Sequence, residues 1–283
     1  MKFGRRCPPA LVALLALVLF AVAVAARTRA DQPARATPAI HVIPGDWGGA
    51  PPANVEAVLR SAADALLACV PDHGIALIHV GGGSGPVVFY QRAADGGYQV
   101  RLNTRDTYWA QYAFQFAHEV GHILCGYDAV QSGNHFLEES ICEAASLFAL
   151  RRMAETWKDR PPYPNWAGYA PHLRRYAQDR IDAAKLPPGQ SLADWYRANA
   201  DALRANATDR EKNLVIAAAL LPLFEADPTS AWSAVRRLNA NEPAEPTPFD
   251  QHLRRWHAQT PEPHRPFVRQ LAAAFGVKID EPR

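Results

Sequence analysis

The sequence predicts an α+β fold, with a small mixed β-sheet packed on a helix that carries an H-E-x-x-H motif and a mainly α-helical C-terminal part behind it. Three observations support this. Short apolar runs of β type precede residue 104, helical apolar spacing dominates from residue 108 onward, and the motif lies near this change. The composition, 48% hydrophobic and 20% charged over 283 residues, excludes a disordered chain or a coiled-coil rod.

The N-terminus has the pattern of an export signal. Lys2, Arg5 and Arg6 precede the unbroken apolar run 10–26, which ends with an A-x-A cleavage pattern at 23–25. We therefore expect residues 1–26 to be a signal peptide, and an exported protein, periplasmic or secreted, without a membrane span after cleavage. An uncleaved membrane anchor is the alternative, because the length of this run lies at the short end of the range that spans a bilayer.

The region that precedes the motif helix has mixed structure. Residues 27–39 are polar and rich in Pro and Ala, which predicts a disordered linker. An α+β core is expected over 40–160. In its first part we expect a helix at 54–68 and strands at 75–80, 87–91 and 98–103. A glycine loop at 81–85 lacks the Lys-Ser/Thr of a phosphate loop, and a hairpin turn is expected at 95–97.

From residue 108 the pattern is helical. Pro-rich loops separate the later segments, so 161–283 is expected to form a helical C-terminal subdomain. The predicted helices span 108–125, 136–157, 170–184, 190–204, 209–226, 229–239, 248–258 and 264–275.

The motif His118-Glu119-Val120-Gly121-His122 is the strongest chemical signal. At 100° per residue, His118 and His122 lie 40° apart, beside Gln111 and Gln115. Apolar residues fill the opposite face, so the helix packs on a core and presents both imidazoles on its other side. Two histidines at i and i+4 can reach one zinc ion at about 2.0–2.1 Å, whereas the alternative is a pair of surface histidines.

A catalytic zinc ion needs a third protein ligand and an open position. On the next predicted helix, Glu139 lies opposite the apolar side, together with Glu143, whereas Glu138 is rotated by about 100°. We expect Glu139 to be the third ligand, with a shift of one residue, to Glu138, as the alternative. Glu143 is expected to accept a hydrogen bond from the far nitrogen of a ligand histidine, or else to form a simple salt bridge.

These residues resemble the gluzincin type of zincin-like zinc metallopeptidase, in which H-E-x-x-H is followed by a glutamate on the next helix. The resemblance covers roughly residues 75–150 and implies Zn²⁺ bound by His118, His122 and Glu139, with Glu119 as general base. It also implies a peptide or protein substrate along an edge strand, for which 98–103 is the candidate. The gap of 16 residues from His122 to Glu139 is slightly shorter than usual in the family.

Several alternatives stay open. The chain could be a non-catalytic exported module that binds metal or a partner on a zincin scaffold, or a zinc amidase acting on cell-wall peptide. No oxyanion-stabilising residue is evident, and the candidates are Tyr163, Tyr169, His172 and Tyr176.

Charge excludes one class of partner and leaves the assembly open. The net charge of +2 and the absence of a basic half argue against nucleic acid. The sequence does not indicate the oligomeric state. Cys125 and Cys142 could form a disulfide in an exported protein or remain buried thiols.

Overall fold

A mixed four-stranded sheet forms one side of the computed structural model, which describes residues 37–70, 72–127, 133–241, 243 and 245–280. The strand order is β1-β2-β4-β3, and both β1 and β4 run parallel to β2, whereas β3 is antiparallel to β4. The strands are β1 (Ala39–Val42), β2 (Leu77–Gly82), β3 (Val87–Val88) and β4 (Tyr98–Leu102).

The sheet differs from expectation at both of its edges. β1 was not predicted, and it begins at Ala39, so the expected disordered linker 27–39 is wrong at its last residue. The strand forms because this short run pairs with a strand almost forty positions further along the chain. The candidate substrate strand, 98–103, is wrong as an edge, since β4 lies between β2 and β3. The antiparallel pairing of β3 with β4 leaves the far side of β3 as the edge.

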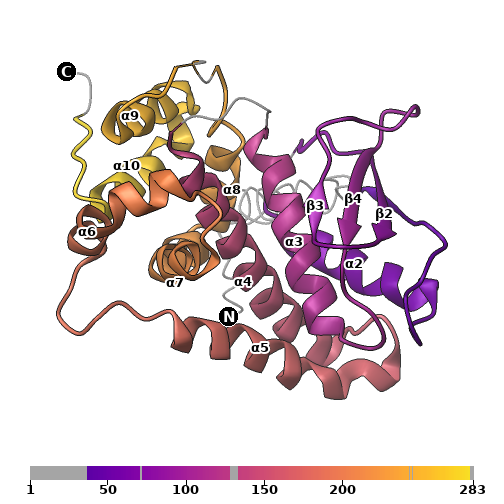
Figure 1. Ribbon diagram of the computed structural model, residues 1–283. Helices are drawn as coiled ribbons and strands as arrows, with labels where there is room; N and C mark the ends of the chain where they lie inside the picture. Colours follow the sequence, from indigo (N-terminus) through magenta and orange to yellow (C-terminus); the bar gives the residue numbers. More distant parts are fainter. Residues whose placement is uncertain (1–36, 71, 128–132, 242, 244, 281–283) are drawn as a thin grey trace, which may run out of the picture. The chain divides into compact units, whose positions relative to one another are not determined.

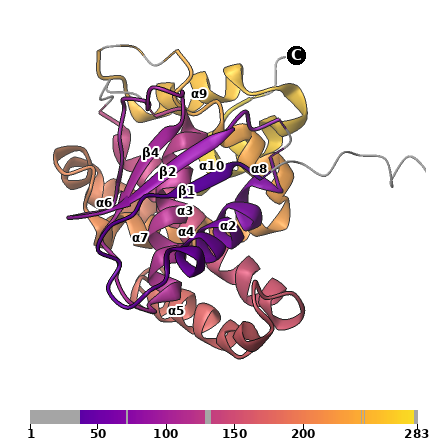
Figure 2. The same ribbon diagram turned by 90° about the vertical axis from the view of Figure 1, so that its right-hand side faces the viewer.

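One face of the sheet packs on two helices, α2 (Pro52–Leu67) and α3 (Trp109–Cys125). Strand residues that point inward are buried, and in Figure 2 the strands lie in front of α3 with α2 beneath them. Pro52 begins α2, where its missing N–H costs nothing. Gly126 ends α3 with a left-handed φ of 66°, which a residue without Cβ adopts freely.

Helix α4 (His135–Asp159) lies at the centre of the packing and contacts α2, α3, α5 and α7 (Figure 1). Every residue from 140 to 150 is buried. Its polar face packs on α3, where a Cβ at Gly121 would lie 3.1 Å from the Cys142 Cα. Ser146 Oγ donates a hydrogen bond to the Phe114 carbonyl at 2.8 Å, so the two motif-bearing helices are in close contact.

The remaining helices pack around α4 and on one another. Four aromatic rings, Phe136, Tyr196, Phe249 and Phe275, join its first turn to this C-terminal region. The segments are η1 (Pro164–Tyr169), α5 (Ala170–Ala183), α6 (Leu192–Ala205), α7 (Arg210–Ala226), α8 (Pro228–Val235), α9 (Phe249–Gln259), η2 (Glu262–His264) and α10 (Arg265–Ala274).

This arrangement confirms the predicted α+β class with its small mixed sheet and helical C-terminal part. The predicted helices match those observed to within a few residues, α8 being the most shortened. The expected signal peptide 1–26 lies outside the described residues, as does the expected linker up to residue 36. Among the described residues, no helix combines the length and the apolar character that a membrane crossing requires.

Candidate metal centre

Helix α3 places both motif histidines on its cleft side. Their side chains are 15% and 12% exposed, and their ring centroids lie 5.0 Å apart. The rest of this helix is largely buried, as the apolar face in the sequence predicts. Gln115, on the same face of α3, joins this helix to the segment just after β4. Its side-chain amide accepts a hydrogen bond from the backbone N–H of Asn103 and donates one to the side chain of Asn103. The helix that carries the two imidazoles is thus fixed by its buried face and by its contact with the end of β4.

Glu139 on α4 faces both histidines. One carboxylate oxygen lies 3.4 Å from His118 Nε2, and the other lies 3.9 Å from His122 Nε2. The three predicted ligand side chains therefore converge, with the same ring nitrogen of each histidine turned inward. Two imidazole nitrogens and a carboxylate are a donor set that suits zinc and leaves a further position open.

The outward nitrogens of the two rings face other carboxylates. His122 Nδ1 lies 2.6 Å from Glu138, whose second oxygen accepts a hydrogen bond from Asn239 Nδ2, also at 2.6 Å. His118 Nδ1 lies 3.7 Å from Glu143. A carboxylate on Nδ1 keeps the proton there and leaves Nε2 as the electron-pair donor, which is the arrangement metal-binding histidines commonly have.

His135 is a site residue that the sequence interpretation did not assign, whereas Glu138, considered there only as an alternative metal ligand, lies against His122 Nδ1. His135 stacks on His122 and lies 3.4 Å from both Glu138 and Glu139. The sequence contained a signal for this contact, because His135, Glu138 and Glu139 stand at positions i, i+3 and i+4, which share one helix face. It was missed because α4 begins one residue earlier than expected, at His135 itself.

Cys142 offers an alternative to Glu139, since its sulfur and one nitrogen of each motif histidine lie within 4.8 Å of one another. The thiol is fully buried between α3 and α4 and hydrogen bonds to Cys125. Burial raises its pKa well above the usual value, so the thiol keeps its proton in the metal-free protein. Both cysteines are free thiols, so the disulfide considered from the sequence is not formed in this structure. Glu139 remains the better candidate ligand, because its two carboxylate oxygens face the Nε2 atoms of both histidines.

Glu119 is 3% exposed and lies in the same cavity as the two histidines. Burial raises the pKa of its carboxyl group, against the opposing effects of His118 and His122 and of a backbone hydrogen bond from Val88 on β3. A raised pKa makes a carboxylate a better proton acceptor near neutral pH. Its position next to His118, but outside the converging set, suits the role of general base.

The negative charges of the carboxylates in the candidate site are balanced by its histidines. Burial would lower the pKa of His118, but Glu139 and its acidic neighbours raise it to about 9. Glu138 and Glu139 likewise raise the pKa of His135 to about 10. Burial opposes ionisation of Glu138, yet His122 and His135 hold its pKa at about 2, and the pKa of Glu139 is lowered as well. Protons therefore occupy this site in the metal-free protein.

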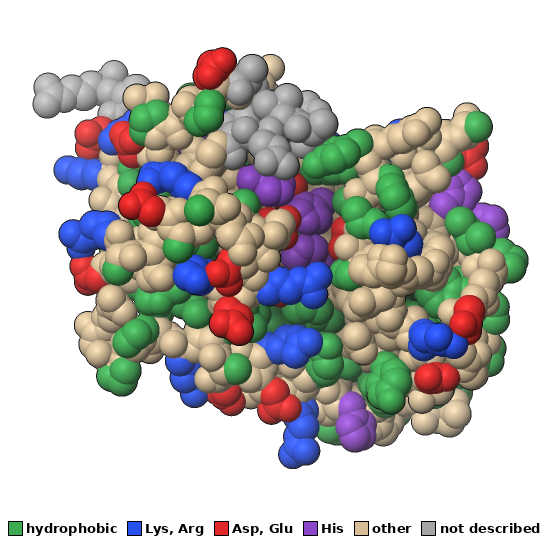
Figure 3. Space-filling view, viewed as in Figure 1, with side chains coloured by type: hydrophobic (Ala, Val, Ile, Leu, Met, Phe, Trp, Pro, Cys, Tyr) green, Lys and Arg blue, Asp and Glu red, His purple; other side chains and the backbone are tan. Residues whose placement is uncertain are grey.

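A cavity of about 240 Å³ opens in front of these groups. Figure 3 shows histidine side chains in a hollow between the sheet side and the C-terminal helices. The edge strand lines one wall with Val87 and Val88, and Arg210 at the start of α7 lines the other. Among the expected oxyanion candidates, Tyr163, Tyr169, His172 and Tyr176, none lines this cavity, whereas Tyr127 and His135 do.

The comparisons with known proteins add no assignment. No protein-family model matches the chain, and neither a curated protein nor a solved structure is found to be similar to it.

Proposed function

We propose that this protein is an exported zinc metallopeptidase that hydrolyses peptide bonds. One observation carries the proposal: the Nε2 atoms of His118 and His122 both face the Glu139 carboxylate, beside the buried carboxyl group of Glu119. The outward carboxylates of Glu138 and Glu143 fit the same interpretation, because they set the tautomer that a metal requires. Export rests on the sequence of residues 1–26.

The donor set fits zinc, with His118, His122 and Glu139 as its ligands. A bound zinc ion would act as a Lewis acid, lowering the pKa of water to about 7 and polarising a peptide carbonyl. Glu119 accepts the proton of the attacking water on its carboxylate and delivers it to the amine that leaves. Glu138 holds the His122 imidazole in place through its hydrogen bond, and the carboxylate of Glu143 lies near Nδ1 of His118.

The edge strand supports an extended peptide as the substrate. Among the strands of the described residues, β3 pairs with β4 alone, and its outer side forms part of the cavity wall at Val87 and Val88. A peptide that adds to this edge can form backbone hydrogen bonds whatever its side chains are. The bond to be cleaved would then lie in front of Glu119.

The first test is metal content. The purified protein is expected to hold about one zinc ion per chain by plasma mass spectrometry, because three ligands converge. His118→Ala should lose the metal. His172→Ala, which changes an exposed histidine on α5, should keep it. Protein that takes up no zinc at neutral pH would contradict the proposal.

The second test is turnover. Glu119→Gln should keep zinc and lose at least about 100-fold in cleavage of a mixed peptide library, since proton transfer contributes this much. Glu56→Gln, which changes a partly exposed partner of Arg60 on α2, is the matched control and should leave cleavage unchanged. Bound zinc without any cleavage by the unaltered protein would favour the non-catalytic module instead.

A further inference from the structure

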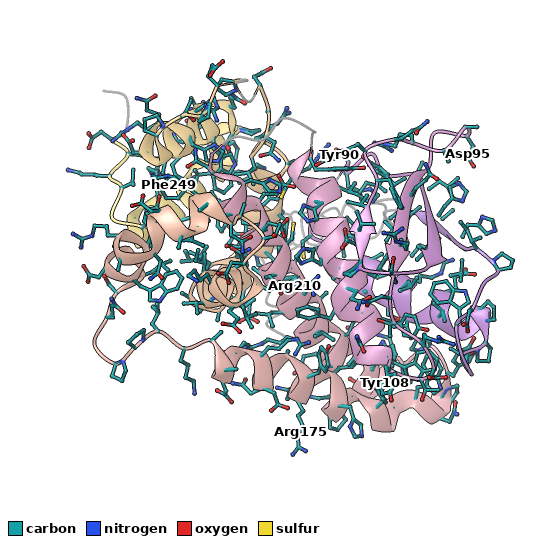
Figure 4. The ribbon with its side chains drawn as sticks, in the orientation of Figure 1. Tyr90, Asp95, Tyr108, Arg175, Arg210 and Phe249 are labelled. Carbon is teal, nitrogen blue, oxygen red and sulfur yellow. The ribbon has the colours of Figure 1, made fainter. Side chains whose placement is uncertain are left out.

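A second, smaller pocket adjoins the metal centre on the far side of His118. Its volume is about 90 Å³, and it shares Pro86, His118 and Arg210 with the larger cavity. We call it the arginine pocket, after Arg180 on α5 and Arg210 on α7. Figure 4 shows Arg210 beside the middle of α4, at the start of α7. The two arginines come from separate helices and meet at the same place.

The positive charge of this pocket exceeds its negative charge. Glu143 is its acidic lining residue, and its carboxylate already faces His118 Nδ1. Within the described part of the chain, neither guanidinium group has a carboxylate within 4.0 Å. Two guanidinium groups against one carboxylate leave a net positive charge of about one beside the metal site.

The position of Arg180 is fixed by its neighbours. Its guanidinium donates a hydrogen bond to the Tyr176 hydroxyl at 2.6 Å and lies over the rings of Tyr176 and Phe114, at 4.0 and 4.6 Å from their centroids. A guanidinium that lies over aromatic rings and donates one hydrogen bond still has other N–H groups available for a ligand. The group is thus arranged before any ligand arrives.

We propose that the arginine pocket binds a carboxylate group of the substrate, next to the bond that is cleaved. Planar guanidinium groups match carboxylates in shape and form strong charge-assisted hydrogen bonds with them. The small volume suits one such group rather than a further peptide residue. The carboxylate is either the side chain of an Asp or Glu residue or the free C-terminus of the peptide. This inference rests on the proposed peptidase function and specifies its substrate class.

The test compares matched peptides. A peptide cleaved in the library is remade with Glu or Gln at each position that flanks the cleaved bond, and with a free or amidated C-terminus. The zinc-loaded protein should cleave one carboxylate version at least about tenfold faster in kcat/KM than its amide counterpart. The position at which this occurs separates a side-chain carboxylate from a C-terminal one.

Variants then assign the preference to the pocket. Arg180→Gln and Arg210→Gln should lower the ratio of kcat/KM for the carboxylate peptide to that for its amide counterpart from at least about tenfold to about one, with zinc content unchanged. Arg175→Gln is the control, since Arg175 is exposed on α5 and points away from the cleft in Figure 4. Equal cleavage of carboxylate and amide peptides, or equal loss on both in the variants, would overturn the inference.

A binding measurement separates this inference from the peptidase proposal. Calorimetry on zinc-loaded Glu119→Gln compares the dipeptide acetyl-Gly-Glu with its fully amidated analogue acetyl-Gly-Gln-amide. Binding at least about tenfold tighter to the acid, lost with Arg210→Gln, supports the pocket even if no peptide is cleaved. A preference that survives in Arg210→Gln would assign it to the metal and refute the pocket.

Discussion

Glu138 gives the sharpest test of how the proposed metal centre is built. Its two carboxylate oxygens accept from two different donors, His122 Nδ1 and Asn239 Nδ2, each at 2.6 Å. The substitution Glu138→Gln keeps the shape but replaces one acceptor with an N–H₂ donor. The new group must then face either His122 or Asn239 with a donor against a donor, in a position that is only 4% exposed.

The expected loss is confined to metal affinity. Removing a carboxylate that orients a ligand histidine costs about 10–100-fold in affinity, or about 1.4–2.8 kcal/mol. Glu143→Gln should cost less, because its distance to His118 Nδ1 is 3.7 Å rather than 2.6 Å. Glu139→Gln should lose far more than either, since it removes a ligand.

The assay is a competition titration of zinc against a chromophoric chelator at fixed pH, with circular dichroism as a control for folding. The reasoning fails if Glu138→Gln abolishes zinc binding while Glu139→Gln retains it. That result would exchange the two roles, which the sequence alone left one residue apart. An unchanged affinity in Glu138→Gln would refute the orienting role.

Three further predictions concern the same two helices. Gly121→Ala should destabilise the protein by about 1–3 kcal/mol in urea unfolding, because the new Cβ would lie 3.1 Å from the Cys142 backbone; an unchanged midpoint would contradict this close contact. The thiols of Cys125 and Cys142, whose pKa values are raised by burial, should react with iodoacetamide only after unfolding, as mass spectrometry of the labelled protein will show. Zinc binding should tighten as the pH rises from 6 to 9, because the metal must displace the proton of His118, whose pKa is about 9. Calorimetry in buffers of different ionisation enthalpy measures the released protons. An affinity for zinc that does not change with pH would contradict the raised pKa of His118.

The sequence predicted the parts of the fold that depend on local patterns. Apolar spacing located the helices, and the helix predicted at 108–125 ends where α3 ends, at Cys125. Strand order could not be predicted in this way, since β1 and β2 are neighbours only because distant segments pair. The strand predicted at 87–91 is present as β3 but is only two residues long, and its place at the edge of the candidate site is likewise set by pairing rather than by a local pattern.

The candidate site shows the same division. The i, i+4 spacing of the histidines and the helical phase of Glu139 were sufficient to bring these residues together. The phase did not reveal that Glu138 also reaches the site, because that depends on how α4 crosses α3. The contribution of Asn239 and of the two pocket arginines depends on tertiary packing from more than thirty positions away, to which no local pattern corresponds.

The hydrogen bond from Asn239 to Glu138 joins positions 101 residues apart. Until the segment after α8 has packed, Glu138 lacks this partner and the His122 ring lacks a fixed support. The support of the His122 ring is therefore complete only after residue 239 has been synthesised and the segment after α8 has packed on α4. Under the function proposed above, the peptidase would reach its full metal affinity only once most of its length has folded, so a partly made chain would be a weak enzyme.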